Sequence, residues 1–432
     1  MATKFRLIVM NFLQYAVWGT YLTSMGTYLG SIGLGANIGL FYAMQGIVSI
    51  FMPGLIGIIA DRWVPAQRML GLCHALAAVF MIAAGYYGLI AGSETQFSTL
   101  FPLYSLSVAF YMPTIALSNS VAYSVLGISG LDTVKHFPPI RVFGTVGFIC
   151  AMLMTNFIKF NGHSMQGLPE QLIFSGILGI MLALYTLTLP HLRIEKSDKK
   201  KSLVETLGLN AFSLFKEKKM AIFFIFSMLL GVSLQITNGF ANPFITSFKA
   251  LPEYASTFGA NNANALISLS QISETLCILL IPFCLRKFGI KKVMLMSMIA
   301  WVLRFGLFGA GDPGMGVWMF VLSMLVYGIA FDFFNISGSL FVDKETDKSI
   351  RSSAQGLFMM MTNGFGATIG TLGAQVVVNK FTHSTEFESS IYTVGDWSVV
   401  WYIFAGYALV VAILFAIVFK YKHKPEEMAN VR

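Results

Sequence analysis

Long apolar stretches recur along the whole chain and limit its possible folds more than any other feature. A bilayer core offers no water to the backbone, so a span of about 20 apolar residues folds as a membrane helix. The chain is 56% hydrophobic and only 11% charged, unlike a soluble domain of 432 residues. Twelve stretches are long enough to cross a bilayer: 7–30, 36–60, 69–92, 98–125, 139–159, 171–190, 219–247, 262–285, 292–311, 315–341, 353–380 and 397–420.

These stretches fall into two sets of six separated by one polar, lysine-rich segment, a layout typical of secondary transporters. We therefore predict an all-α membrane protein with twelve transmembrane helices in two six-helix bundles around a central cavity. The predicted domains are an N-terminal bundle over 1–190, a cytoplasmic linker over 191–218 and a C-terminal bundle with a short cytoplasmic tail over 219–432. No cleavable signal peptide is evident, so we expect the first stretch to be retained as a helix.

The basic residues predict the orientation of the chain in the membrane. Of the 29 lysine and arginine residues, 24 fall at one set of helix ends or in the linker, and three fall at the opposite ends: Lys159, Lys249 and Lys380. Basic loops stay in the cytoplasm, so both termini and the linker are predicted to be cytoplasmic. The net charge of +9 follows from this topology and indicates contact with anionic lipids rather than with nucleic acid.

Polar residues in the predicted spans carry most of the functional information, because they are costly in lipid. Several occur three or four positions apart, which places them on one helix face. In the N-terminal half, Arg141, Thr145 and Phe148 share a face. In the C-terminal half the corresponding residues are Gln235 with Asn238, Gln271 with Glu274, and Tyr327 with Phe331. Amides, a carboxylate, an arginine and flat rings suit a neutral ligand with hydroxyls and an aromatic ring, and suit a bare ion poorly.

Two carboxyl groups in the C-terminal half are candidates for proton coupling. Glu274 and Asp332, which follows Phe331, both lie within predicted spans. A carboxylate is poorly solvated there, so the group can bind a proton at neutral pH. The chain has no GxxxxGK[ST] phosphate loop, so we expect neither ATP hydrolysis nor a cofactor, and a proton gradient as the driving force. Sodium is the alternative driving ion.

Other polar and small residues have simpler interpretations. Amides such as Gln235 and Asn238 often hydrogen-bond between membrane helices, which is the alternative to a role in binding. His74 and Arg304 have no polar neighbour at helical spacing, so we expect structural roles for both. The spacing of the four cysteines fits neither a disulfide framework nor a metal site. The glycines near 144–147 and 364–370 are expected to let helices approach closely.

Several runs resemble a known family. The turn from Gly57 to Arg62 resembles the G-x-x-x-D-R/K signature of the major facilitator superfamily. Longer runs look like the bacterial nucleoside:H⁺ symporters of the nucleoside permease type: NFLQYAVWGTYL (11–22), FPPIRVFGTVGF (137–148), SQISETL (270–276) and YGIAFDFFNISGSLFV (327–342). The resemblance extends over nearly the whole chain.

The resemblance implies a substrate site and a function. Its substrate-binding positions match Arg141, Thr145, Phe148, Gln235, Asn238, Gln271, Glu274, Tyr327 and Phe331, and Asp332 matches a functional carboxylate. It implies a monomer in the bacterial cytoplasmic membrane that takes up nucleosides with protons by alternating access, and is not an enzyme. The alternatives are a sugar or oligosaccharide symporter, a proton-independent nucleoside facilitator, and a membrane enzyme or non-transporting nutrient sensor.

Overall fold

The computed structural model describes residues 2–192, 209–347, 350–387 and 390–422. The chain divides into two compact units, Met1–Leu207 and Gly208–Arg432. The boundary falls within the predicted linker 191–218, most of which lies outside the described residues. Its last part, Leu209–Lys216, is a 3₁₀ helix.

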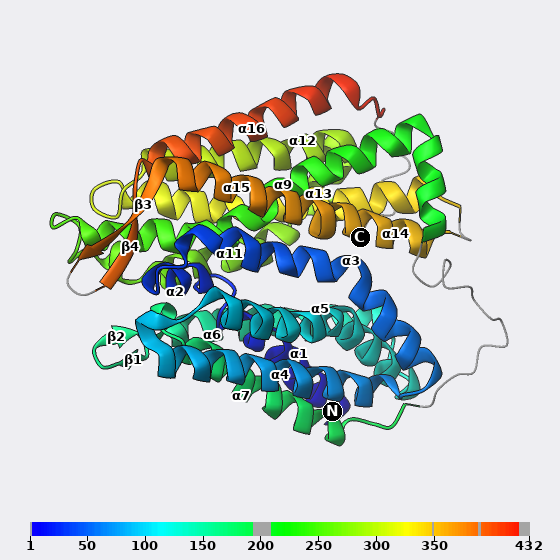
Figure 1. The fold of residues 1–432 in the computed structure, drawn as a ribbon. Helices are drawn as coiled ribbons and strands as arrows, with labels where there is room; N and C mark the ends of the chain where they lie inside the picture. The colour runs from blue at the N-terminus through cyan, green and yellow to red at the C-terminus, as the bar shows by residue number, and fades with distance from the viewer. Residues whose placement is uncertain (1, 193–208, 348–349, 388–389, 423–432) are drawn as a thin grey trace. The chain divides into compact units, whose positions relative to one another are not determined.

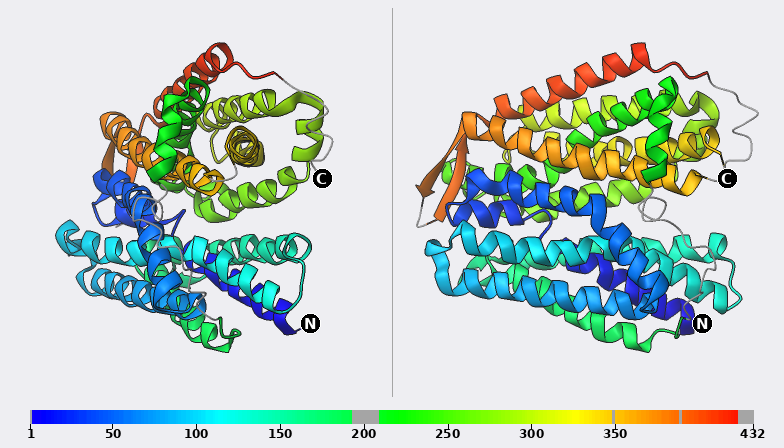
Figure 2. Two further views of the ribbon diagram at one scale, coloured as in Figure 1. Left: turned by 90° about the vertical axis from the view of Figure 1, so that its right-hand side faces the viewer. Right: turned by 45° about the vertical axis from the view of Figure 1, so that its right-hand side comes forward.

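Helices make up nearly all of both units (Figure 1). The first unit contains α1 (Ala2–Gly19), α2 (Met25–Ser31), α3 (Ile38–Arg62), α4 (Ala66–Ala91), α5 (Phe97–Ile128), α6 (Thr133–Phe157) and α7 (Glu170–Tyr185). The second contains α9 (Lys218–Ser247), α10 (Phe258–Asn261), α11 (Ala263–Ile278), α12 (Ile281–Ala310), α13 (Val317–Glu345), α14 (Arg351–Met359), α15 (Ala367–Phe381) and α16 (Trp397–Val418). Within the second unit, α13 packs against α11 and α12 and is seen end-on in the left view of Figure 2.

Nine helices in the described part of the chain are long and apolar enough to cross a membrane. They cover nine of the twelve predicted spans. Of the other three predicted spans, 7–30 and 262–285 are interrupted in the structure, whereas 353–380 is a continuous run of α14, a π-helical segment and α15. The chain is therefore a predominantly helical membrane protein, and for 7–30 and 262–285 the prediction of one continuous helix was wrong.

The first interruption separates α1 from α2 at residues 20–24. The carbonyl groups near the break accept hydrogen bonds from hydroxyls of other helices. Ser175 on α7 donates to the carbonyl oxygen of Val17 at 2.8 Å, and Tyr42 on α3 donates to that of Leu22. Because the backbone groups are satisfied in this way, the helix can break within an apolar stretch.

The predicted spans 262–285 and 353–380 have local structures that differ from this one. Pro282 lies in the first turn of α12, where its missing N–H favours the start of a new helix over continuation of α11. The loop predicted after residue 285 is instead a kink inside α12 at Gly289, whose φ of 78° suits glycine. Between α14 and α15, Met360–Gly366 form a π-helical segment.

Two short β-hairpins add to the helices. Strands β1 (Lys159–Phe160) and β2 (His163–Ser164) pair antiparallel between α6 and α7. Asn161 and Gly162 both have positive φ, as a tight two-residue hairpin turn requires. Strands β3 (Thr382–Phe387) and β4 (Ser390–Gly395) pair antiparallel before α16. Hence the all-α prediction missed two hairpins, both next to loops predicted to be periplasmic.

Glycines bring helices into close contact in each unit, as predicted. In the first unit, a Cβ on Gly147 of α6 would lie 2.1 Å from the carbonyl oxygen of Phe12 on α1. In the second unit, a Cβ on Gly370 of α15 would lie 2.2 Å from the carbonyl oxygen of Val232 on α9. The helix that carries Arg141 and Phe148 is therefore held directly against α1.

Candidate functional site

The predicted site residues of the first unit lie on α6, beside α1. Phe148 is only 5% exposed and meets Trp18 edge to face, with ring centroids 6.2 Å apart. The guanidinium carbon of Arg141 lies 3.9 Å from the centroid of the Tyr15 ring. Thr145, between them, is half-buried. The α6 face thus combines a flat ring, a hydroxyl and a stacked cation.

A buried hydrogen-bond network supports the α1 side of this group. Gln14 donates from Nε2 to the Thr114 hydroxyl at 2.7 Å, and its Oε1 lies 2.7 Å from Nε2 of His74. The Tyr111 hydroxyl donates to the backbone carbonyl of Gln14 at 2.8 Å, and the Tyr111 ring lies 6.0 Å from Trp18. His74 therefore joins α4 to α1.

The two predicted amides on α9 interact with each other. Asn238 donates from Nδ2 to Oε1 of Gln235 at 2.5 Å, and Gln235 is buried whereas Asn238 is half-buried. This bond lies within one helix, so it is not the interhelical bond considered as the alternative. The hydrogen bond orients the two side chains as a pair. Each amide keeps further donor and acceptor atoms for other partners.

A second group of predicted residues gathers where α11 meets α13. The rings of Tyr327 and Phe331 stack with centroids 5.6 Å apart and an interplanar angle of 15°. Glu274 lies within electrostatic range of Tyr327 and is half-buried, as is Gln271 one helical turn earlier. The Ser273 hydroxyl donates to the carbonyl oxygen of Leu325 and ties the two helices together. An aromatic pair thus lies beside a carboxylate.

Asp332 lies on α13 directly after the stacked pair of Tyr327 and Phe331. It follows Phe331 by one residue, which is roughly 100° around a helix. Its side chain is 5% exposed and lies within electrostatic range of Tyr327 and of the Cys277 thiol on α11. Asp332 is therefore more enclosed than Glu274, and both carboxyl groups belong to the α11–α13 region.

Sequence reasoning missed residues that contact the predicted ones. Tyr15 and Trp18 on α1 contact Arg141 and Phe148, and Trp301 on α12 meets Tyr327 edge to face at 6.0 Å. Tyr15 and Trp18 are three residues apart, so they share a helix face. That spacing was the available signal, but aromatic residues in an apolar span are more often packing residues.

Comparison with known proteins decides the family. The sequence model described as "Nucleoside H+ symporter" matches residues 1–424. The chain belongs to the nucleoside H⁺ symporter family. It is 48% identical to the xanthosine permease of Escherichia coli K12, over 100% of this chain and 99% of that protein. It is 46% identical to the nucleoside permease NupG of the same organism, over 98% and 97% of the two chains.

Solved structures agree with this assignment. A crystal structure of the nucleoside transporter NupG, in a mutant form, matches with a TM-score of 0.89 at 45% identity, covering 97% of this chain and 100% of that one. A POT family peptide transporter matches with a TM-score of 0.67 at 13% identity, which shows a shared fold alone. The family resemblance noted in the sequence is thus confirmed. The protein is a transporter rather than an enzyme, and its function is proton-coupled nucleoside uptake.

Proposed function

We propose that this symporter works by alternating access and that the predicted site residues on α6, α9, α11 and α13 bind the nucleoside. The observation that carries this is the stacked Tyr327–Phe331 pair beside Glu274. A nucleobase is a flat ring that stacks on aromatic side chains, and a ribose offers hydroxyls to a carboxylate. Family membership supplies the substrate class, and the side chains supply the chemistry.

Each group has a proposed role. Phe148, Tyr327 and Phe331 stack on the base. Gln235, Asn238, Gln271 and Glu274 bind ribose hydroxyls and base edges, while Arg141 and Thr145 add polar contacts.

Asp332 and Glu274 are the proposed proton carriers. A protonated, neutral carboxyl group favours the loaded transporter, because no charge has to be desolvated as the site closes. Release of the nucleoside into the cytoplasm then frees the proton. The driving force is the proton gradient, without a further cofactor.

The twelve predicted spans are proposed to cross the bacterial cytoplasmic membrane, with both termini in the cytoplasm and the protein acting as a monomer. The interrupted helices support this assignment, because transporters use discontinuous membrane helices near their substrate sites. The basic residues at one set of helix ends support the orientation and contact with anionic lipids.

Proteoliposome uptake tests the proposal. Labelled uridine and adenosine are supplied with and without an imposed inward proton gradient. We expect accumulation above equilibrium only with the gradient, and its loss when an uncoupler is added. Excess sugar should not compete. Uptake that equilibrates but never accumulates, with no effect of the uncoupler, would support a facilitator, and binding without uptake would support a sensor.

A further inference from the structure

Arg304 is a fully buried arginine in the C-terminal part of α12. Its side chain is 1% exposed, although the helix is one of those apolar enough to span a membrane. An arginine in such a position is costly and faces the interior of a helix bundle rather than lipid. Its surroundings therefore indicate what offsets that cost.

The contacts of Arg304 join α11, α12 and α13. Nη1 donates to the carbonyl oxygen of Ser323 at 2.7 Å and reaches the Ser270 hydroxyl at 3.4 Å. In return, the Ser323 hydroxyl donates to the carbonyl oxygen of Arg304 at 2.9 Å. The guanidinium carbon lies 4.5 Å from the centroid of the Tyr327 ring and 5.2 Å from that of Phe308. The planar cation is thus fixed over the face of Tyr327.

The same ring links Arg304 to the acidic residues. Tyr327 lies within electrostatic range of Arg304, of Glu274 on α11 and of Asp332 on α13. The Cys277 thiol on α11 is the other titratable group near Asp332. On the α16 side, α12 meets aromatic rings, with Phe305 against Trp401 and Phe404. Arg304 is therefore connected to the α11–α13 region through Tyr327.

We propose that Arg304 is a positioning residue for nucleoside binding. Its guanidinium holds the Tyr327 ring in the orientation that stacks with Phe331. This inference rests on the proposed role of Tyr327. It replaces the purely structural role expected from the isolated position of Arg304 in the sequence.

Two substitutions test whether the planar guanidinium is needed. Arg304→Lys keeps the positive charge but loses the planar group, so uridine KM should rise roughly tenfold. Arg304→Met loses both the charge and the planar group, so KM should rise at least as much. In both variants the maximal rate of uptake should stay near the wild-type value, because the proposed proton carriers are unchanged. Both variants are assayed by uptake into proteoliposomes, with melting temperature measured in detergent.

Ser297→Ala is the matched control. Ser297 is also buried on α12 and donates to the carbonyl oxygen of Ala330 on α13. Its loss should lower the melting temperature without changing KM. If Ser297→Ala raised KM in the manner of the Arg304 variants, general helix packing would explain the effect and the inference would fail.

A wild-type KM in Arg304→Met would overturn the inference. If that variant does not reach the membrane, Arg304→Lys decides, because a wild-type KM there would refute the stacking role. Tyr327→Leu distinguishes this failure from failure of the proposed function. If Tyr327→Leu raises KM while the Arg304 variants do not, only the role of Arg304 is wrong. If Tyr327→Leu also behaves as wild type, the proposed substrate site itself is wrong.

Discussion

Phe148 illustrates how single residues acquire a role through their neighbours. Its ring is fixed by the edge of Trp18 and by the close approach of α6 to α1, where a Cβ on Gly19 would lie 2.5 Å from the carbonyl oxygen of Phe148. A ring held in one orientation loses little conformational freedom when a base stacks on it. Phe148 is therefore well prepared for stacking.

Phe148→Ala should weaken nucleoside binding by about 1–2 kcal/mol, the usual worth of stacking a base on an aromatic side chain. The measurement is uridine affinity of purified protein in detergent, by calorimetry. Phe143→Ala is the control, because Phe143 is on the same helix but 40% exposed. An unchanged affinity in Phe148→Ala would remove Phe148 from the site.

Glu274→Gln should weaken uridine binding by about 0.5–1.5 kcal/mol, because an oxygen that accepts from a ribose hydroxyl is replaced by an amide NH₂ group. Uptake at saturating uridine should also respond less to the external pH. Asp332→Asn serves as the comparison: if Asp332 alone carries the proton, that variant loses accumulation but keeps its affinity for uridine. Normal transport by Glu274→Gln from acid to alkaline buffer would show that Glu274 has no role in the site.

Residue types at helical spacing predicted the Tyr327–Phe331 stack and the shared faces of α6 and α11. They did not predict the partners of those residues. Trp18 and Trp301 are apolar enough to fit any packed helix, and Arg304 has no polar neighbour along its own helix. Contacts between helices give these residues their roles, and the sequence of one helix does not show which residues of other helices contact it.

At the scale of helices, both units use the same kind of contact. Gly147 of α6 meets the backbone of α1, and Gly366 and Gly370 meet the backbone of α9. Backbone contact leaves no room for a side chain, so the distance between the two helices is set by the glycines. The glycines near 144–147 and those near 364–370 thus have a similar packing role.

Gly147→Ala should destabilise the protein by about 1–3 kcal/mol, because the new methyl group would lie 2.1 Å from the carbonyl oxygen of Phe12. The melting temperature in detergent measures this effect, and uridine affinity should fall as Phe148 moves away from Trp18. Gly127→Ala is the control, since a Cβ there would meet nothing within 4 Å. Equal stability of the two variants would contradict the close approach of α1 and α6.

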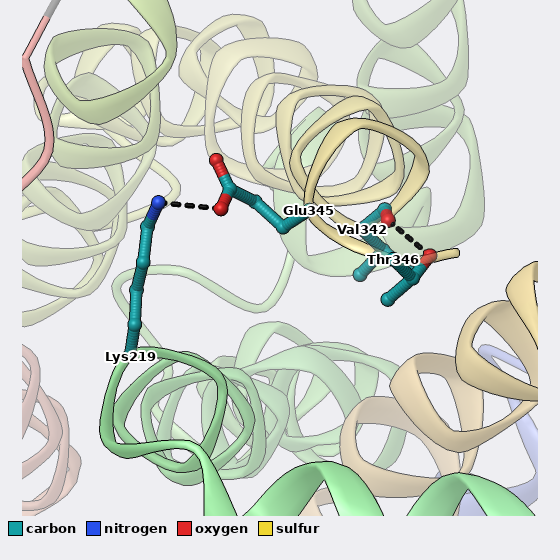
Figure 3. Close-up of polar contacts among 4 residues, drawn as sticks. All are labelled: Lys219, Val342, Glu345 and Thr346. Carbon is teal, nitrogen blue, oxygen red and sulfur yellow. Dashed lines mark hydrogen bonds and ion pairs between the residues drawn. The ribbon is translucent and has the colours of Figure 1, made fainter.

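Lys219 and Glu345 form an ion pair between the ends of α9 and α13, at 2.5 Å (Figure 3). Lys219 is 41% exposed, and its ammonium group also lies 4.8 Å from the centroid of the Tyr421 ring. Lys219→Ala should therefore cost only about 0.2–1 kcal/mol, and less at high salt. Melting temperatures at low and high salt measure this difference. A large loss that salt does not reduce would mean that the pair is shielded from solvent.

Hydropathy predicted where helices lie but not where they break. The break after Gly19, the start of α12 at Ile281 and the π-helical segment at Met360–Gly366 all lie inside apolar stretches. The break after Gly19 depends on hydroxyl donors from neighbouring helices, and the start of α12 depends on Pro282 in its first turn. The β1–β2 hairpin had a local signal, Asn161-Gly162, which is the preferred pair for such a turn.

At the scale of the whole molecule, the sequence alone predicted a helical membrane transporter, because lipid admits few backbone structures and each span must be long and apolar. Nine helices in the described part of the chain that are long and apolar enough to cross a membrane, together with the family match, agree with this. Nucleoside preference, by contrast, depends on side-chain positions to within a fraction of an ångström, which apolar periodicity does not encode.

Coupling of nucleoside and proton movement in one cycle is the central claim, and proton flux tests it most directly. Proteoliposomes containing the wild-type protein and a pH-sensitive dye are given uridine with no imposed gradient. We predict that the interior acidifies as uridine enters, and that the acidification is absent in vesicles containing the Asp332→Asn, Glu274→Gln double variant. Uridine entry at the wild-type rate with no change in internal pH would contradict the account.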